Sequence, residues 1–126
     1  MSSLSDSITS RKDAASASRI IRIAVLVSGT GSNLQSIIDH IEAGKLNATI
    51  ACVISNREDA FALERAKNHR IPALILNHRS FPDRAAFDTA LVKKLREHAV
   101  ELVVLAGFNR ILSSVMLEAF PQAILN

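Results

Sequence analysis

Residues 23–34 read Ile-Ala-Val-Leu-Val-Ser-Gly-Thr-Gly-Ser-Asn-Leu, and this stretch decides the fold of the chain. Its first five residues are a continuous run of β-branched and aliphatic side chains. Such a run fits a strand buried on both faces of a parallel sheet better than an alternating surface strand. The two glycines that follow permit a sharp turn, and Ser32 and Asn33 are residue types that commonly cap a helix start. The stretch therefore predicts a strand, a glycine turn and a helix.

The turn at Gly29 and Gly31 also predicts a binding site for an anion. Neither glycine carries a Cβ atom, so the backbone can approach a ligand closely. A helix that begins behind the turn points its free N–H groups and the positive end of its dipole toward it. We therefore predict that a small phosphate or carboxylate binds here, with Ser32 and Asn33 beside it. A tight turn without a ligand is the alternative.

The residues around this turn exclude two better-defined phosphate motifs. The Walker motif requires a Gly-Lys-Ser or Gly-Lys-Thr sequence, and none follows these glycines. The dinucleotide fingerprint requires a third glycine, where this chain has Leu34. It also requires an acidic residue near the end of the second strand, where residues 55–57 read Ser-Asn-Arg.

Length and composition describe one globular domain. A chain of 126 residues with 48% hydrophobic residues can bury a substantial core without dividing into two domains. No apolar run approaches the length of a membrane span, and residues 1–20 lack the apolar centre of a secretory signal. We therefore expect no membrane association and a cytoplasmic location.

Charge and cysteine content indicate which classes of ligand and which cysteine chemistry the chain can have. The net charge of +3 and the pI of about 9.5 suit small anionic substrates. The basic residues are spread along the sequence and Trp and Tyr are absent, so nucleic-acid binding is not expected. Cys52 is the single cysteine and lies within the apolar run 50–54, which excludes a disulfide within the chain and predicts a buried, unreactive thiol. No metal site is predicted.

Strand and helix patterns alternate along residues 21–126. This alternation predicts an α/β fold: a doubly wound, mostly parallel sheet with right-handed crossovers and helices on both faces. Residues 1–20 are rich in Ser, Ala and Asp without an apolar period, so we expect a disordered N-terminal extension. The sequence stops at the start of the fifth strand, which suggests a domain that is incomplete at its C-terminus. The predicted strands cover about 21–28, 46–55, 71–76, 101–107 and 123–126, and the predicted helices about 33–43, 56–68, 83–98 and 113–120.

A loop over residues 77–84 leaves the carboxyl end of the third predicted strand. Open parallel sheets bind ligands outside the carboxyl ends of their strands, so His78, Arg79 and Arg84 are placed where chemistry can use them. Solvated loop charges are the alternative. The helix that follows is expected to carry its apolar residues on one face and its Asp and Lys residues on the other; the apolar residues are Phe87, Leu91, Val92 and Leu95.

A second glycine turn follows the fourth predicted strand and begins at Gly107. Arg110 in this turn is suited to bind a carboxylate, and Phe108, Ile111 and Leu112 can supply an apolar wall. For at least two of these apolar residues, a place in the core is the alternative. Ser113 or Ser114 is expected to cap the short helix behind the turn.

Three motifs, in this order, resemble the phosphoribosylglycinamide formyltransferase family. They are residues 25–35 (Val-Leu-Val-Ser-Gly-Thr-Gly-Ser-Asn-Leu-Gln), 55–60 (Ser-Asn-Arg-Glu-Asp-Ala) and 103–112 (Val-Val-Leu-Ala-Gly-Phe-Asn-Arg-Ile-Leu). The resemblance runs from about Ile21 to Asn126. It implies that the amine of glycinamide ribonucleotide takes a formyl group from 10-formyltetrahydrofolate in purine (IMP) biosynthesis. Residues 21–126 then form the phosphate-binding N-terminal domain, and a homodimer is compatible with this assignment.

The resemblance also implies roles for individual residues. Gly31, Ser32 and Asn33 match the loop that holds the ribonucleotide phosphate, which agrees with the anion site predicted from the turn. Gly107 matches a backbone contact to the same substrate. Asn126 matches a catalytic asparagine that also contacts the folate, and its amide can donate a hydrogen bond to the oxyanion as the amine attacks. The remaining folate-site matches are Arg84, Asn109, Arg110, Ile111 and Leu112.

Two features depart from the family pattern. Asn109 stands where the family more often has methionine. The family's catalytic histidine follows the asparagine by two residues, and an aspartate that tunes it lies further on, so both would come after Asn126. We therefore expect little or no turnover from these 126 residues alone. The histidines present are no substitutes, because three lie in or at the ends of predicted helices and one has no matching role: His40, His69, His98 and His78.

Other functions are compatible with parts of this pattern. Formyltetrahydrofolate deformylase resembles the same family in its carboxyl half, but the Gly-Thr-Gly-Ser-Asn loop favours an acceptor that bears a phosphate over water. A non-catalytic phosphate-binding or ribonucleotide-binding module is a second alternative. A response-regulator receiver domain is excluded, because residues 28–29 and 76–77 replace the acidic residues that it requires.

Overall fold

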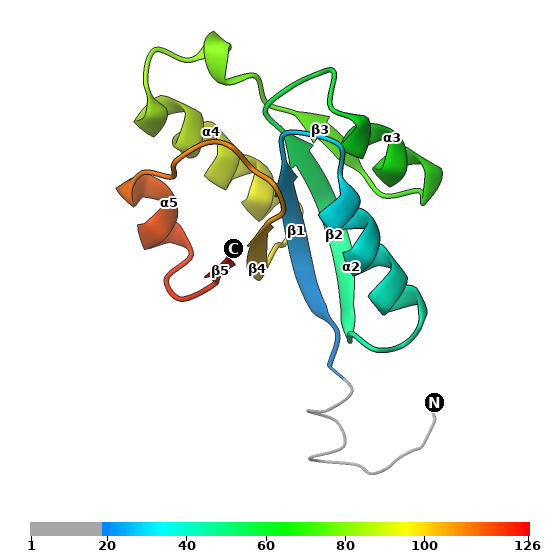
Figure 1. The fold of residues 1–126 in the computed structure, drawn as a ribbon. Helices are drawn as coiled ribbons and strands as arrows, with labels where there is room; N and C mark the ends of the chain where they lie inside the picture. Colours follow the sequence, from blue (N-terminus) through cyan, green and yellow to red (C-terminus); the bar gives the residue numbers. More distant parts are fainter. Residues whose placement is uncertain (1–18) are drawn as a thin grey trace.

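The structure is a computed structural model that describes residues 19–126 (Figure 1). Apart from Arg19 and Ile20, the predicted disordered extension lies outside the described residues. The strands are β1 (Ile21–Val27), β2 (Ala48–Ser55), β3 (Ala73–Ile75), β4 (Leu102–Leu105) and β5 (Ile124–Leu125). The helices are α2 (Ser32–Glu42), α3 (Phe61–Asn68), α4 (Arg84–Glu97) and α5 (Ser114–Ala119), with a 3-10 helix at His78–Ser80.

The five strands form one parallel sheet in the order β3-β2-β1-β4-β5. Helices α2 and α3 cover one face of this sheet, and α4 and α5 cover the other (Figure 1). The chain therefore winds outward from β1 in both directions, first through β2 and β3 and then through β4 and β5. This confirms the predicted doubly wound α/β fold.

Strand β1 lies at the centre of the fold and is buried on both faces. Ile23 and Val25 pack with α2 and α3, whereas Ala24 and Leu26 pack with α4 and α5, as the two-residue period of a strand requires. The pairing with β2 shifts between Ile23 and Ala24, so β2 has one more residue than β1 at a bulge. The continuous apolar run is thus explained by the helical cover on both sides.

Helix α4 shows the main error in the predicted burial. Phe87, Leu91 and Leu95 face the core as expected, and Phe87 makes an edge-to-face contact with Phe81 at a centroid distance of 5.6 Å. Asp88, however, is fully buried, although its charge predicted a place on the exposed face. Its carboxylate accepts hydrogen bonds inside the protein from the backbone and the hydroxyl of Ser113.

The structure corrects several predicted boundaries. Helix α2 is capped by Gly31, in the left-handed region with φ 81°, and not by the side chain of Ser32 or Asn33. Residues 56–60 form a loop before α3 and not its first turn. No helix in the described part of the chain is long and apolar enough to cross a membrane.

Candidate functional site

Gly31 sets the shape of the loop between β1 and α2. Its φ of 81° is unfavourable for any residue with a Cβ atom, and an added Cβ would lie 2.6 Å from the Cβ of Ala62. The carbonyl of Gly31 accepts the first helical hydrogen bond, from Gln35 N at 2.8 Å. The side chains of Ser32 and Asn33 are exposed at the first turn of α2. The N–H groups of this turn therefore face the loop without an intrahelical partner.

Helix α3 holds this loop in place from the same side of the sheet. Ala62 N donates to the carbonyl of Gly29 at 3.1 Å, and Arg65 Nε donates to the carbonyl of Thr30 at 2.8 Å. The guanidinium of Arg65 also lies over the ring of Phe61, 5.0 Å from its centroid. A permanent positive charge thus lies against the loop in which the sequence predicts an anion.

Three polar side chains form a closed ring at the carboxyl ends of β1, β2 and β4. Ser28 Oγ donates to Asn56 Oδ1 at 2.7 Å, Asn56 Nδ2 donates to Asn109 Oδ1 at 3.0 Å, and Asn109 N donates back to Ser28 Oγ at 2.9 Å. Ser28 Oγ also lies 2.9 Å from Asn109 Oδ1, so its single hydroxyl proton has two acceptors within hydrogen-bond distance. Ser28 and Asn56 are buried. The ring therefore ties the loop after β4 to the ends of β1 and β2.

A polar cleft of about 680 Å³ opens beside this ring. His78 and Arg79, both singled out from the sequence, line it, and His78 Nδ1 lies 3.4 Å from Asn56 Nδ2. Arg57 at its rim makes two hydrogen bonds to Asp59, at 3.1 and 3.0 Å, and these lower the pKa of that carboxyl. The full lining is Asn56, Arg57, Glu58, Asp59, Asn77, His78, Arg79 and Asn109.

The turn after β4 divides its apolar residues between core and solvent. Phe108 and Leu112 pack against the core under α4 and α5, whereas Ile111 is 70% exposed. The predicted apolar wall is thus reduced to one outward side chain. Gly107 has φ 74° and open space where a Cβ would stand, so a ligand can approach the backbone there. Arg110 has a buried Nε atom that no protein group in the described part of the chain accepts.

Asp88 holds the far end of the same turn. Its Oδ2 accepts hydrogen bonds from Ser113 N at 2.6 Å and from Ser113 Oγ at 2.7 Å. Ser113 is also the N-cap of α5, because its Oγ accepts from Val115 N at 3.3 Å. Sequence reasoning missed Asp88, Ser28 and Asn56, because each acts through residues more than 20 positions away.

The remaining candidate residues, Arg84 and Asn126, lie at the carboxyl edge of the sheet. Arg84 is the first residue of α4 and is exposed, and Asn126 follows Leu125, which pairs with Val104 of β4. No hydrogen bond of the described residues joins Gly31, Ser32 or Asn33 to Arg84, to Asn126 or to the turn after β4. The phosphate and folate candidates therefore form two separate groups at this edge.

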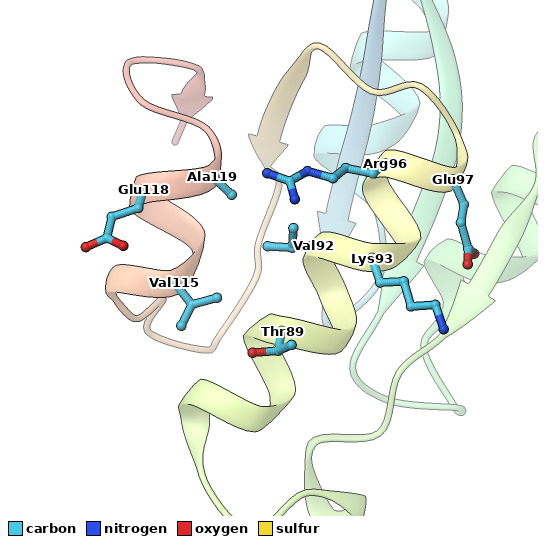
Figure 2. Close-up of a pocket in the computed structure, with 8 residues that line it drawn as sticks. All are labelled: Thr89, Val92, Lys93, Arg96, Glu97, Val115, Glu118 and Ala119. Atoms are coloured by element: carbon cyan, nitrogen blue, oxygen red, sulfur yellow. The ribbon is translucent and has the colours of Figure 1, made fainter.

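A groove of about 840 Å³ between α4 and α5 holds none of the predicted site residues (Figure 2). Val92 and Arg96 extend from α4 toward it, and Val115 and Ala119 line it on α5. Residues 19–126 contain no group of three or more His, Cys, Asp or Glu side chains that could hold a metal. Cys52 is fully buried as predicted, and burial raises the pKa of its thiol to about 11.

Comparison with known proteins places these features in a family. The family description "Formyl transferase" matches residues 21–126. The phosphoribosylglycinamide formyltransferase of Haemophilus influenzae is 45% identical over 105 residues, which are 83% of this chain and 50% of that protein. That of Escherichia coli is 42% identical over 106 residues, again 50% of its length. The chain thus spans about half the length of the curated relatives it matches.

Comparison with solved structures leads to the same family. The glycinamide ribonucleotide transformylase 1 of Symbiobacterium toebii superposes with a TM-score of 0.81 at 46% sequence identity, and the match covers 83% of this chain and 50% of that one. Sequence and fold agree over nearly all of the part that the structure describes. Over residues 21–126, the chain therefore belongs to the formyl transferase family.

Proposed function

We propose that this chain supplies the ribonucleotide-phosphate half of a formyl transferase site. The reaction moves the formyl group of 10-formyltetrahydrofolate to the amine of glycinamide ribonucleotide, a step of purine biosynthesis. The observation that carries the proposal is the open first turn of α2, in which Gly31 places free N–H groups beside Ser32 and Asn33. A phosphate is the ligand that this geometry accepts best, and the relatives named above are enzymes of this reaction.

The other candidates take roles at the same edge of the sheet. Gly107 offers its backbone to the ribonucleotide, because the space around it is open. Arg84 and residues 109–112 contact the folate, with Ile111 as an apolar contact and Arg110 as a cation for its carboxylate. Asn126 donates a hydrogen bond from its amide to the oxyanion that forms when the amine attacks the formyl carbon. The amine attacks directly, so no covalent enzyme intermediate forms.

The phosphate assignment is tested by Ser32→Asp, measured by calorimetric titration with glycinamide ribonucleotide. The new carboxylate stands beside the phosphate, and like charges a few ångströms apart repel by about 1–4 kcal/mol, so binding weakens at least about fivefold. An acidic residue in the first turn of a helix interacts favourably with the helix dipole, so we expect the variant to keep its fold.

Ser36→Asp is the matched control, because Ser36 is an exposed serine of the same helix, one turn further from the loop. It should bind the ribonucleotide with an affinity close to that of the unmodified chain. Equal affinities for the Ser32→Asp and Ser36→Asp variants would overturn the phosphate assignment.

A further inference from the structure

The turn after β4 has an unusual combination of exposure and anchoring. Ile111 is 70% exposed at its centre, yet the residues on either side of residues 110–112 are tied down by polar groups. A large apolar side chain that is exposed on a mobile loop adds nothing to the stability of the fold and offers no fixed surface to a ligand. On a fixed loop it presents a preformed contact surface to a ligand.

The first anchor is the ring formed by Ser28, Asn56 and Asn109. It fixes both the backbone and the side chain of Asn109, because the N–H group donates to Ser28 and the Oδ1 atom accepts from Asn56. All three residues are bonded in one cycle, and two of them, Ser28 and Asn56, are buried. The loop is therefore held on the β1 side.

The second anchor is Asp88, which holds Ser113 through both its backbone N–H and its hydroxyl. This carboxylate is fully buried, and no cation of the described residues lies within ion-pair distance of it. Its Oδ1 atom has no hydrogen-bond partner in the described part of the chain. A buried carboxylate with so few partners costs free energy, so stability does not explain it.

We infer that Asp88 is a positioning residue for the folate contact, acting through Ser113 together with the ring at Asn109. The two anchors lie on either side of residues 110–112, and Leu112 also packs against the core, so Arg110 and Ile111 are presented in one conformation. Asp88 also lies one helical turn after Arg84, so the same bond fixes the loop relative to that cation. This inference rests on the proposed folate role of residues 109–112.

The test compares Asp88→Leu with Asp88→Asn. Leucine has a similar size but no acceptor, whereas the amide oxygen of asparagine can still accept from Ser113. Amide hydrogen exchange is measured on residues 107–113, with residues 23–27 as the internal reference. Asp88→Leu should speed exchange in the loop at least tenfold and leave the reference unchanged, and Asp88→Asn should stay within about threefold of the unmodified chain.

Binding separates a positioning role from a general structural one. The probes are 5-formyltetrahydrofolate, a stable isomer of the proposed co-substrate, and glycinamide ribonucleotide. Asp88→Leu should weaken binding of the folate probe at least tenfold and change ribonucleotide binding less than twofold. In Asp88→Asn the affinity for the folate probe should be restored. Unchanged loop exchange, or equal weakening of both probes, would overturn the inference.

Two further outcomes are decided by the same measurements. If the unmodified chain does not bind the folate probe, the folate role in the proposed function fails, while loop exchange still shows whether Asp88 anchors the loop. If Asp88→Leu does not fold, Ser113→Ala replaces it, with its exposed neighbour Ser114→Ala as control. Faster loop exchange in Ser113→Ala alone supports the anchor, and equal exchange in both variants contradicts it.

Discussion

At the scale of single residues, Gly31 is the glycine at which an added Cβ atom would clash with a neighbouring helix. Its left-handed backbone disfavours every side chain, and an added Cβ would lie 2.6 Å from the Cβ and 2.7 Å from the Cα of Ala62. The sequence predicted a close approach at this turn, but it pointed to a ligand. The structure shows that helix α3 also comes close to this turn, and the packing of the loop after β1 against α3 is not visible in a local sequence pattern.

Gly31→Ala should therefore destabilise the protein by roughly 2–4 kcal/mol, the sum of backbone strain and the clash with Ala62. The measurement is urea denaturation followed by circular dichroism. Gly29→Ala is the matched control, because nothing lies within 4 Å of a Cβ added there, and its free energy of unfolding should change by less than about 0.5 kcal/mol. Similar losses in the two variants would show that the packing of Gly31 on Ala62 does not limit stability.

The polar residues behind the site were the hardest to predict. Ser28, Asn56 and Asp88 look like ordinary strand-end and helix-surface residues, and their roles depend on partners distant in sequence. A charged residue in a helix is expected on the exposed face, unless the core contains a hydrogen-bond donor for it. For Asp88 that donor is Ser113, which the sequence predicted only as a possible helix cap.

At the scale of elements, three helices end in the same hydrogen-bond pattern. After α4, Ala99 N donates to Arg96 O at 3.1 Å and Val100 N to Leu95 O at 3.1 Å, with Ala99 at φ 54°. The ends of α2 and α3 repeat this Schellman motif with Gly44 and Arg70 in the left-handed position. The glycine at position 44 correctly predicted the end of α2 from the sequence. Arg70 and Ala99 gave no such signal, because neither residue type favours the left-handed region.

Ala99→Gly should stabilise the protein by about 0.5–1 kcal/mol. The relief of left-handed strain at alanine exceeds the extra backbone entropy that glycine loses on folding. Gly44→Ala should lower the free energy of unfolding by a similar amount. The added Cβ would meet open space, so only the cost of the left-handed backbone remains. Thermal unfolding followed by calorimetry gives both values, and a loss of stability in Ala99→Gly would contradict the account of this helix end.

At the scale of the whole molecule, the alternation of apolar runs with helical segments was enough to predict the fold. Only a sheet covered on both faces explains the unbroken apolar run of β1. The strand order then brings the loops after β1 and β4 to one edge, on opposite sides of the switch in winding direction. The candidate residues of both loops were accordingly found at this edge, while their separation into two groups with no hydrogen bond between them in residues 19–126 required the structure.

The central claim is that the first turn of α2 binds the phosphate of a ribonucleotide. The most direct measurement is an NMR titration of the isotope-labelled chain with glycinamide ribonucleotide and, in parallel, with the same riboside lacking the phosphate. We predict amide shifts at Ser32, Asn33 and Leu34 with the ribonucleotide, and binding at least tenfold weaker for the riboside. Equal binding of both compounds, or shifts confined to the cleft at His78 and Arg79, would contradict the claim.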